Sequence, residues 1–216
     1  MTLGKSVADI RKDYLMDSLE EKDVQKIPFQ QFEQWFDAAV KSEVLEPNAM
    51  ALATVKDGRP SLRIVLLKGF DEKGMVFYTN YESKKAQELA ENPLAALTFF
   101  WPELERQVRI EGSIEKVGHE ESDTYYQSRG RGSRIGAWAS PQSQVIENRS
   151  ILEQKVQDIQ HKFEGKERFP KPDHWGGYRL KPDYFEFWQG RSSRLHDRII
   201  YSLQTDGNWD IKRLAP

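Results

Sequence analysis

The sequence contains no cysteine and no long apolar run. A chain without cysteine has no disulfides, no thiolate metal ligands and no cysteine nucleophile. The longest apolar stretches, such as residues 64–67, fall far short of the roughly 20 residues needed to span a bilayer. The first residues also lack the apolar segment of a secretory signal. We therefore expect a cytoplasmic protein without a membrane partner.

An excess of positive charge is also missing. Lys and Arg together number 32 against 34 Asp and Glu, which gives a formal net charge of −2. A general nucleic-acid binder draws its affinity from excess positive charge, so we expect no nucleic-acid partner. The histidines are too scattered for metal-ligand spacing, so we expect no metal site. The glycine-rich dinucleotide motif, the P-loop and the nucleophile elbow are absent as well.

The hydrophobic pattern predicts one domain, mainly β with helices (α+β), built as a small antiparallel barrel, closed or split. The polar residues 1–25 are interpreted as a short helix or a mobile arm outside the core, and the domain covers 26–216. Strands at 50–55, 62–67 and 75–79 are joined by tight turns, which predicts an antiparallel meander. Helices are expected from Pro28 and at 83–91, 119–127 and 145–163, and further strands at 94–101, 107–117, 177–180, 184–188, 195–203 and 209–214.

Two short segments carry more positive charge than a fold requires. Lys84 and Lys85 follow Ser83 at the start of a predicted helix, where the helix dipole disfavours cations unless an anion binds. The segment 128–134 holds three arginines separated by small residues, and an arginine side chain binds phosphate oxygens two at a time. Each segment is either a phosphate-binding site or a solvated basic surface, and the residues alone leave both interpretations open.

A third cationic segment is expected on a strand. The two-residue period of a strand places Arg194, His196 and Arg198 on one face, where they need solvent, carboxylates or an anionic ligand. We prefer the anionic ligand, and Trp188 would form a flat wall beside it.

The two-residue period does not place Arg63 and Lys68 on the same face of a strand. Their spacing of five residues places them on opposite faces of a straight strand, unless the strand bends or one of them sits at its end. Several phosphate-suited positions in a chain without a nucleophile fit a phosphorylated aromatic cofactor that carries the chemistry.

Distinct short motifs run in order along nearly the whole chain. They are RIVLLK (63–68), VFYTN (76–80), SKKA (83–86), LERQV (104–108), SRGRGSRIGAWAS (128–140), FWQG (187–190), RLHDR (194–198) and the terminal KRLAP. Together they resemble the pyridoxine/pyridoxamine 5′-phosphate oxidase family. The resemblance implies an FMN-binding split barrel and a homodimer with flavin at the subunit interface. It also implies oxidation of pyridoxine 5′-phosphate or pyridoxamine 5′-phosphate by dioxygen to pyridoxal 5′-phosphate, with hydrogen peroxide and, from the amine, ammonia as co-products.

The resemblance also implies a role for individual residues, with Arg194 and His196 as the catalytic pair and dimerisation and active-site strands over about 174–216. The FMN contacts would be Arg63, Ile64, Val65, Leu66, Leu67, Lys68, Tyr78, Thr79, Lys84, Lys85, Gln107, Gln142, Ser143, Trp188 and Arg198. The substrate contacts would be Lys68, Tyr125, Arg129, Ser133, Arg194 and His196, with Arg11 and Tyr14 of the N-terminal arm closing over the site. Arg63 and Lys68 then serve different ligands, Arg63 the flavin and Lys68 the substrate phosphate.

Two positions depart from the family pattern. Lys84 stands where arginine is frequent, which removes a two-pronged contact, and Gly130 stands where proline is common, which loosens the Arg129 loop. Two other functions remain to be distinguished. A flavin reductase or oxidase of the same fold would act on another substrate. An RNA-binding module would use the arginine-rich segment and exposed aromatic residues, and the net charge argues against it.

Overall fold

The structure is a computed structural model that describes residues 13–216, so Arg11 lies outside the described residues. The chain divides into two compact units. We call the described residues of 13–47, 98–110 and 183–216 the terminal unit, and 48–97 with 111–182 the central unit. None of the helices in the described range is long and apolar enough to cross a membrane.

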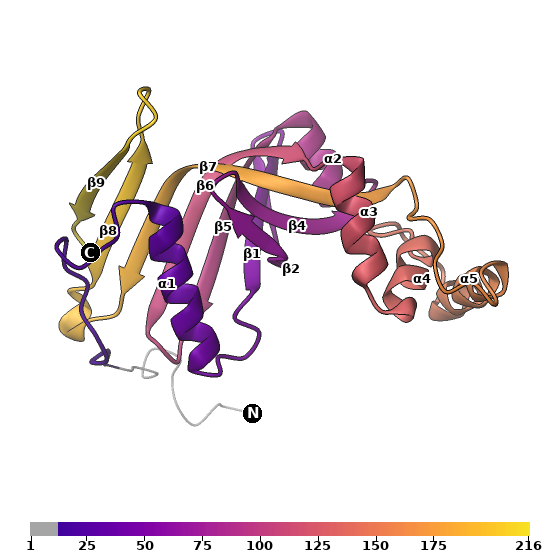
Figure 1. The fold of residues 1–216 in the computed structure, drawn as a ribbon, viewed down its shortest axis with the longest axis horizontal. Helices are drawn as coiled ribbons and strands as arrows, with labels where there is room; N and C mark the ends of the chain where they lie inside the picture. Colours follow the sequence, from indigo (N-terminus) through magenta and orange to yellow (C-terminus); the bar gives the residue numbers. More distant parts are fainter. Residues whose placement is uncertain (1–12) are drawn as a thin grey trace, which may run out of the picture. The chain divides into compact units, whose positions relative to one another are not determined.

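A single antiparallel sheet supplies strands to both units (Figure 1). Its strand order is β2-β1-β5-β6-β7-β4-β3, and β8 pairs with β7 and β9 with β8. The strands are β1 (Ala49–Lys56), β2 (Arg59–Leu66), β3 (Gly69–Asp71), β4 (Gly74–Asn80), β5 (Leu94–Trp101), β6 (Arg106–Lys116), β7 (Trp175–Gln189), β8 (Asp197–Leu203) and β9 (Trp209–Leu214). The helices are α1 (Pro28–Lys41), α2 (Lys84–Glu91), α3 (His119–Ser128), α4 (Arg131–Ala139) and α5 (Arg149–Lys162).

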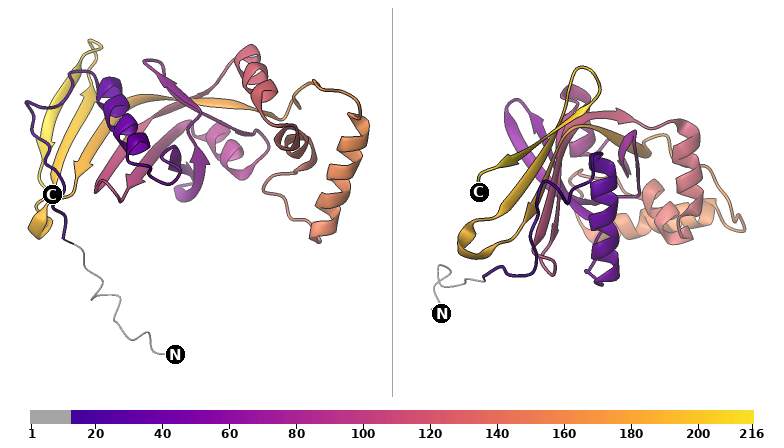
Figure 2. Two further views of the ribbon diagram at one scale, coloured as in Figure 1. Left: turned by 60° about the horizontal axis from the view of Figure 1, so that its bottom comes forward. Right: turned by 60° about the vertical axis from the view of Figure 1, so that its left-hand side comes forward.

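Helix α1 closes the core of the terminal unit. Pro28 at its first turn suits a position where no backbone N–H is needed. The ring centroids of Phe32 and Phe99 lie 5.1 Å apart, and those of Trp35 and Phe187 lie 5.3 Å apart. Further views show α1 lying against the strands of this unit, which include the parts of β5 and β7 that carry Phe99 and Phe187 (Figure 2). The predicted helix from Pro28 is therefore confirmed, and its apolar face is the face it buries.

The N-terminal segment before α1 is tied to the terminal unit. The backbone N–H groups of Leu15 and Met16 donate to the carboxylate of Glu105, at 2.9 and 3.1 Å. The N–H of Leu19 donates to Asp197, and the Leu19 side chain is only 4% exposed. The expectation that residues 1–25 lie outside the core is therefore wrong for Leu19. Movement of an N-terminal arm and a single domain over 26–216 stay predictions.

The predicted meander of three strands is wrong. β1 and β2 form the expected hairpin, but β4 pairs with the short β3 and with β7, from Met75 opposite Leu180 to Asn80 opposite Trp175. The partner of β4 comes about a hundred residues later in the chain, and such a pairing leaves no trace in local turn signals. The sequence also predicts two strands at 177–180 and 184–188, where the structure has the single strand β7.

β7 continues through Pro182 because the neighbouring strand has glycine there. A Cβ added to Gly112 would lie 2.1 Å from the carbonyl oxygen of Lys181 and 2.9 Å from Cα of Pro182. The backbones of β6 and β7 approach this closely only because residue 112 has no side chain.

Gly112→Ala is expected to lower the free energy of unfolding by about 3 kcal/mol, because backbone atoms rather than a flexible side chain must move. Urea unfolding followed by tryptophan fluorescence measures the loss. Gly118→Ala is the matched control, since nothing lies within 4 Å of the added Cβ there. Equal midpoints for the two variants would show that the close approach is not rigid.

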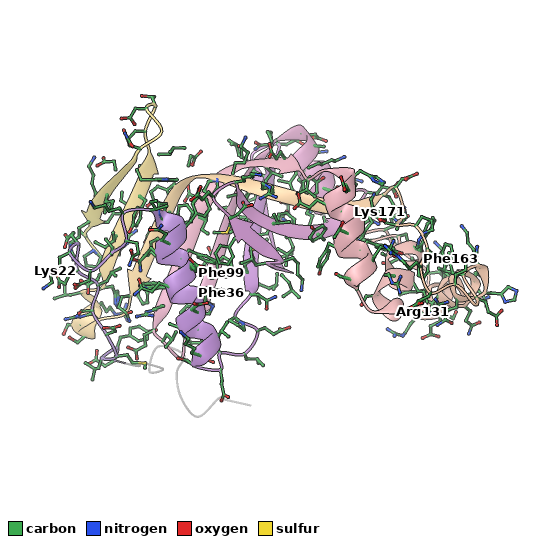
Figure 3. All side chains as sticks on the ribbon, in the orientation of Figure 1. Lys22, Phe36, Phe99, Arg131, Phe163 and Lys171 are labelled. Atoms are coloured by element: carbon green, nitrogen blue, oxygen red, sulfur yellow. The ribbon has the colours of Figure 1, made fainter. Side chains whose placement is uncertain are left out.

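The arginine-rich segment joins two helices: α3 ends at Ser128, and Arg131 begins α4 after two non-helical residues. α4 covers Arg131–Ala139 and buries Ile135 and Ala139. Arg131 donates to the carbonyl oxygen of Phe163 at 2.8 Å, which ties the start of α4 to the end of α5 (Figure 3). The predicted helix over 145–163 begins only at Arg149, and Val145 is fully exposed. Glycines in the segment hide its helical periodicity, which is why the sequence pattern indicated no helix over 131–139.

Candidate functional site

A cavity of about 770 Å³ lies in the central unit. Among the described residues that line it, the charged ones are all cations: Arg63, Lys68, Lys85 and Arg129. A hollow with four cations and no carboxylate favours an anionic ligand. The predicted residues that line it are Arg63, Ile64, Val65, Leu66, Lys68, Tyr78, Thr79, Lys85, Tyr125, Arg129, Ser133 and Gln142.

Stacked aromatic rings form one wall of the cavity. The rings of Tyr78 and Tyr125 are stacked with centroids 3.9 Å apart, and Tyr78 also stacks with Trp175 at 5.4 Å. Burial raises the pKa of Tyr78 to about 12, so its hydroxyl keeps its proton at neutral pH. A flat apolar wall beside cations suits a phosphorylated aromatic ring.

Lys85 presents its ammonium group to one part of the cavity. Its Nζ donates to Oε1 of Gln142 at 2.8 Å, to Thr79 at 3.1 Å and to Ser83 at 3.3 Å. Burial, and then the charge of Arg63, lowers the pKa of Lys85 to about 8. We call Arg63, Thr79, Lys85 and Gln142 the Lys85 set. An amine with this pKa is charged at neutral pH and loses its charge in mild alkali.

A buried carboxylate stands behind this set. Glu88 of α2 is 3% exposed, and its Oε2 accepts hydrogen bonds from Ser61 at 2.7 Å and from Nη2 of Arg63 at 2.9 Å. Thr54 also donates to Oε2 of Glu88, at 2.5 Å. Burial would raise the pKa of Glu88, but these three hydrogen bonds outweigh burial and lower it to about 2.

Arg129 dominates another part of the cavity. Its guanidinium lies 4.7 Å from the ring centroid of Trp175, and its Nη1 is buried without a hydrogen-bond partner among the described residues. Burial lowers the pKa of Arg129. An unpaired buried donor is costly, so this nitrogen is placed to meet an acceptor that a ligand would bring. We call Lys68, Tyr125, Arg129 and Ser133 the Arg129 set.

The structure resolves the conflict between Arg63 and Lys68. β2 ends at Leu66, so Lys68 lies beyond the strand, where its N–H donates to the carbonyl oxygen of Val76 at 2.8 Å. Alternation along a strand does not apply past its end, and both cations line the same cavity.

Three predicted cofactor residues of the central unit do not line the cavity. Leu67 is 4% exposed and belongs to the core. The side chain of Lys84 is 69% exposed and lies 3.8 Å from Glu88, so the two lysines at the start of α2 point in different directions. Ser143 is exposed in a left-handed conformation with φ of 71°. The roles of these three residues stay predictions.

A second group of predicted residues lies in the terminal unit. The rings of Trp188 and His196 have centroids 4.6 Å apart, and Tyr14 meets both edge-on, at 5.7 and 5.8 Å. The backbone N–H of Arg191 donates to Nδ1 of His196 at 3.1 Å. Burial and the charge of Arg194 lower the pKa of His196, which favours its neutral form. Because Nδ1 accepts from Arg191, the neutral imidazole carries its proton on Nε2.

The predicted strand face of Arg194, His196 and Arg198 is wrong. β8 begins at Asp197, and Arg194 ends a 3₁₀ turn over Ser192–Arg194. Ser193 and Arg194 have φ of 55° and 63°, a left-handed conformation that is unusual for residues with a side chain. Two such residues in succession reverse the chain, so the three side chains follow no two-residue period. Arg194 is exposed.

Arg198 is held by a carboxylate. Its Nε and Nη2 donate to the two oxygens of Glu186 at 2.8 and 3.1 Å, and Glu186 is 2% exposed. Arg109 donates to the same carboxylate at 3.0 Å. Gln107, also predicted for the cofactor, lies half-buried on β6.

Sequence reasoning missed Glu88 and Trp175. Glu88 lies three residues after Lys85 in a helix, between the buried Ala86 and Leu89, so a charged residue on the apolar face was a usable signal. Trp175 precedes a glycine pair at the start of β7, and nothing local marks it as part of a cavity. In the described part of the chain, no group of His, Asp or Glu side chains is arranged to hold a metal ion.

Comparisons with known proteins agree with the motifs. The family model described as Pyridoxamine 5′-phosphate oxidase matches residues 36–163. The model described as Pyridoxine 5′-phosphate oxidase C-terminal dimerisation region matches residues 175–216.

Two curated relatives have the same name, pyridoxine/pyridoxamine 5′-phosphate oxidase. The one from Trichormus variabilis is 56% identical over 99% of this chain and 100% of its own length. The one from Cupriavidus pinatubonensis is 58% identical over 97% of this chain and 99% of its own.

A solved structure supports the fold. PhzG from Burkholderia lata, in complex with tetrahydrophenazine-1-carboxylic acid, superposes with a TM-score of 0.86 at 30% identity, over 93% of this chain and 99% of that one. The predicted fold class, an antiparallel split barrel with helices, and the predicted class of enzyme, an oxidoreductase, are confirmed. The chain belongs to the pyridoxamine 5′-phosphate oxidase family.

Proposed function

We propose that this protein oxidises pyridoxine 5′-phosphate or pyridoxamine 5′-phosphate to pyridoxal 5′-phosphate, with FMN as cofactor and dioxygen as oxidant. Hydrogen peroxide is the co-product, and the amine substrate also yields ammonia. The observation that carries the proposal is the cavity beside stacked aromatic rings, where the described residues of the lining include four cations and no carboxylate. The names of the curated relatives point to the same substrates.

The residues of the cavity fit FMN. The Lys85 set offers an ammonium, a hydroxyl and an amide to a phosphate, and the apolar residues at the end of β2 border the same hollow. Bound FMN supplies the two-electron acceptor that the protein itself lacks, and dioxygen regenerates it. The protein itself holds and orients FMN and the substrate and encloses both.

The substrate phosphate is assigned to the Arg129 set. The buried Nη1 of Arg129 gains its missing acceptor from a phosphate oxygen, and Ser133 and Lys68 add donors beside it. Fixing one end of the substrate spends binding energy on orienting the other end, where the chemistry takes place.

Arg194 and His196 are assigned to the substrate's ring and its 4′ substituent. Because Nδ1 of His196 already accepts from Arg191, its Nε2 presents an N–H donor to that substituent. Tyr14 lies against His196, and Arg11 is assigned with it to an arm that closes over the site.

A homodimer with flavin at the subunit interface completes the proposal. The match of residues 175–216 to a dimerisation region supports it. In the central unit, Leu62 and Ile64 are 68 and 66% exposed, and their spacing of two residues on β2 places both on one face of that strand, which a partner subunit would cover.

The visible spectrum of the purified protein tests the function. We expect a flavin absorption band that bleaches when pyridoxamine 5′-phosphate is added without dioxygen and returns when air is admitted. A colourless protein that binds no added FMN would refute the proposed cofactor. A flavin band that the substrate does not bleach would refute the proposed reaction.

The likeness to PhzG favours a second candidate, a flavin oxidase of the same fold with an unphosphorylated substrate. The Arg129 set argues for the phosphorylated substrate, because its two cations, Lys68 and Arg129, match the two negative charges of a phosphate and exceed the single charge of a carboxylate. Bleaching by pyridoxamine at the same rate as by its phosphate would favour the second candidate.

A further inference from the structure

We propose that Glu88 is a positioning residue of the cofactor site: its carboxylate holds Arg63 in place and offsets the charge that Arg63 puts beside Lys85, so that both cations serve one phosphate. The inference rests on the proposed function, because it concerns the residues assigned to the FMN phosphate. Glu88 itself lies outside the lining of the cavity and acts through Arg63.

Glu88 joins a helix to two strands. Its Oε2 accepts from Thr54 on β1, from Ser61 on β2 and from Arg63 on β2. Thr54 and Ser61 face each other in the register of the β1–β2 pair, so their hydroxyls reach one carboxylate oxygen together. Buried groups with every partner in place hold a single geometry. A carboxylate this far from solvent is thus built into the frame of the cavity.

Arg63 cannot turn its outer nitrogens to a ligand while Glu88 holds it. Nη2 donates to Glu88 and Ser61, and Nη1 donates to Thr54 and to the carbonyl oxygen of Leu52 at 3.3 Å. The two outer nitrogens carry two hydrogens each, so these four bonds use all of them. Arg63 therefore contributes fixed positive charge to the cavity, and a phosphate that meets Lys85 would replace one of the three bonds of its ammonium, to Thr79, Ser83 or Gln142.

Two nearby charges, on Arg63 and Glu88, have opposite effects on the pKa of Lys85. The positive charge of Arg63 lowers the pKa of Lys85, after burial, and the negative charge of Glu88 raises it. Without that negative charge Lys85 would lose its proton at a lower pH, and a phosphate would lose its partner. The charged groups around Glu88 and Lys85 are Arg63 on β2, Lys56 on β1, Lys84 and Glu91 on α2, and Lys68 and Arg129 across the cavity.

The test measures FMN affinity of the apoprotein, by quenching of flavin fluorescence, at about pH 6.5 and about pH 8.5. With a Lys85 pKa of about 8, wild type should bind about fourfold more weakly at the higher pH. In Glu88→Gln the pKa of Lys85 should fall by about one, to about 7, so the affinity should drop about 25-fold between the two pH values. At the lower pH this variant should bind as tightly as wild type or more tightly, because one negative charge is gone. Glu91 is an exposed carboxylate of the same helix, and Glu91→Gln should bind FMN as tightly as wild type at both pH values.

A double variant shows whether Glu88 acts through Arg63. Glu88→Gln with Arg63→Gln removes both charges, and the loss of affinity between the two pH values should return to about fourfold. Equal weakening of Glu88→Gln at both pH values would indicate a purely structural role and overturn the inference, as would no change at either.

Two further results keep the inference separate from the proposed function. If wild type binds no FMN at either pH, the proposed cofactor is wrong, whatever Glu88 does. If Glu88→Gln does not fold, Arg63→Gln replaces it. This variant removes the repulsion between Arg63 and Lys85, so its FMN affinity must fall less between the lower and the higher pH than that of wild type. A loss equal to or larger than that of wild type would overturn the inference.

Discussion

Arg129→Leu is expected to raise the KM for pyridoxine 5′-phosphate by about 10²-fold or more and to leave the affinity for FMN within about threefold of wild type. The reason is the buried Nη1 of Arg129, which has no protein acceptor among the described residues and sits in a cavity without carboxylates. A substrate phosphate supplies that acceptor, and leucine keeps the bulk against Trp175 while removing the charge.

Steady-state kinetics with pyridoxine 5′-phosphate, and FMN titration of the apoprotein, give the two numbers. Arg149→Leu is the matched control, because Arg149 is an exposed arginine of α5 that pairs with Glu153 in its own helix. A KM of Arg129→Leu close to that of the control would remove Arg129 from the substrate site.

His196→Asn is expected to lower kcat by about 10²-fold while FMN stays bound. The asparagine amide oxygen can still accept the N–H of Arg191, so the turn before β8 keeps its anchor, while the Nε2 donor and the ring contacts with Trp188 and Tyr14 are lost. Alanine would also remove the acceptor for the N–H of Arg191. The effect of losing the Nε2 donor could then not be separated from a change in the turn.

Turnover and flavin content of the purified variant are measured together. His161→Asn is the control, because His161 is an exposed residue of α5. A normal kcat for His196→Asn would reject a role for the imidazole in orienting the substrate. Loss of flavin together with kcat would instead assign His196 to the cofactor.

Short-range signals in the sequence were sufficient for most elements. The apolar spacing of Phe29, Phe32 and Trp35 defines α1, and Asp206-Gly207 closes the hairpin between β8 and β9, with φ of 86° at Gly207. Predictions of pairing between distant segments failed, as for β4 with β7, because this pairing involves close approaches such as that of Gly74 to Leu180, residues about a hundred positions apart in the chain.

The candidate site was predicted in its residue types more than in its geometry. Lys85 and Arg129 were identified by their cationic surroundings, and both line the cavity. The two-residue alternation failed at Arg194 because Ser193 and Arg194 both adopt positive φ. Neither residue type predicts such a conformation. Glu88 was missed although its place on the apolar face of α2 was a usable signal, and the three donors around it are revealed only by the packed structure.

The central claim is that the cations of the cavity hold two phosphorylated rings, and a crystal structure of the protein with FMN and pyridoxal 5′-phosphate tests it most directly. Our account predicts one phosphate within hydrogen-bond distance of Lys85 and the other within hydrogen-bond distance of Arg129, with the two rings stacked on each other. Density for either molecule on an unrelated surface, with Lys85 and Arg129 touching neither phosphate, would contradict it.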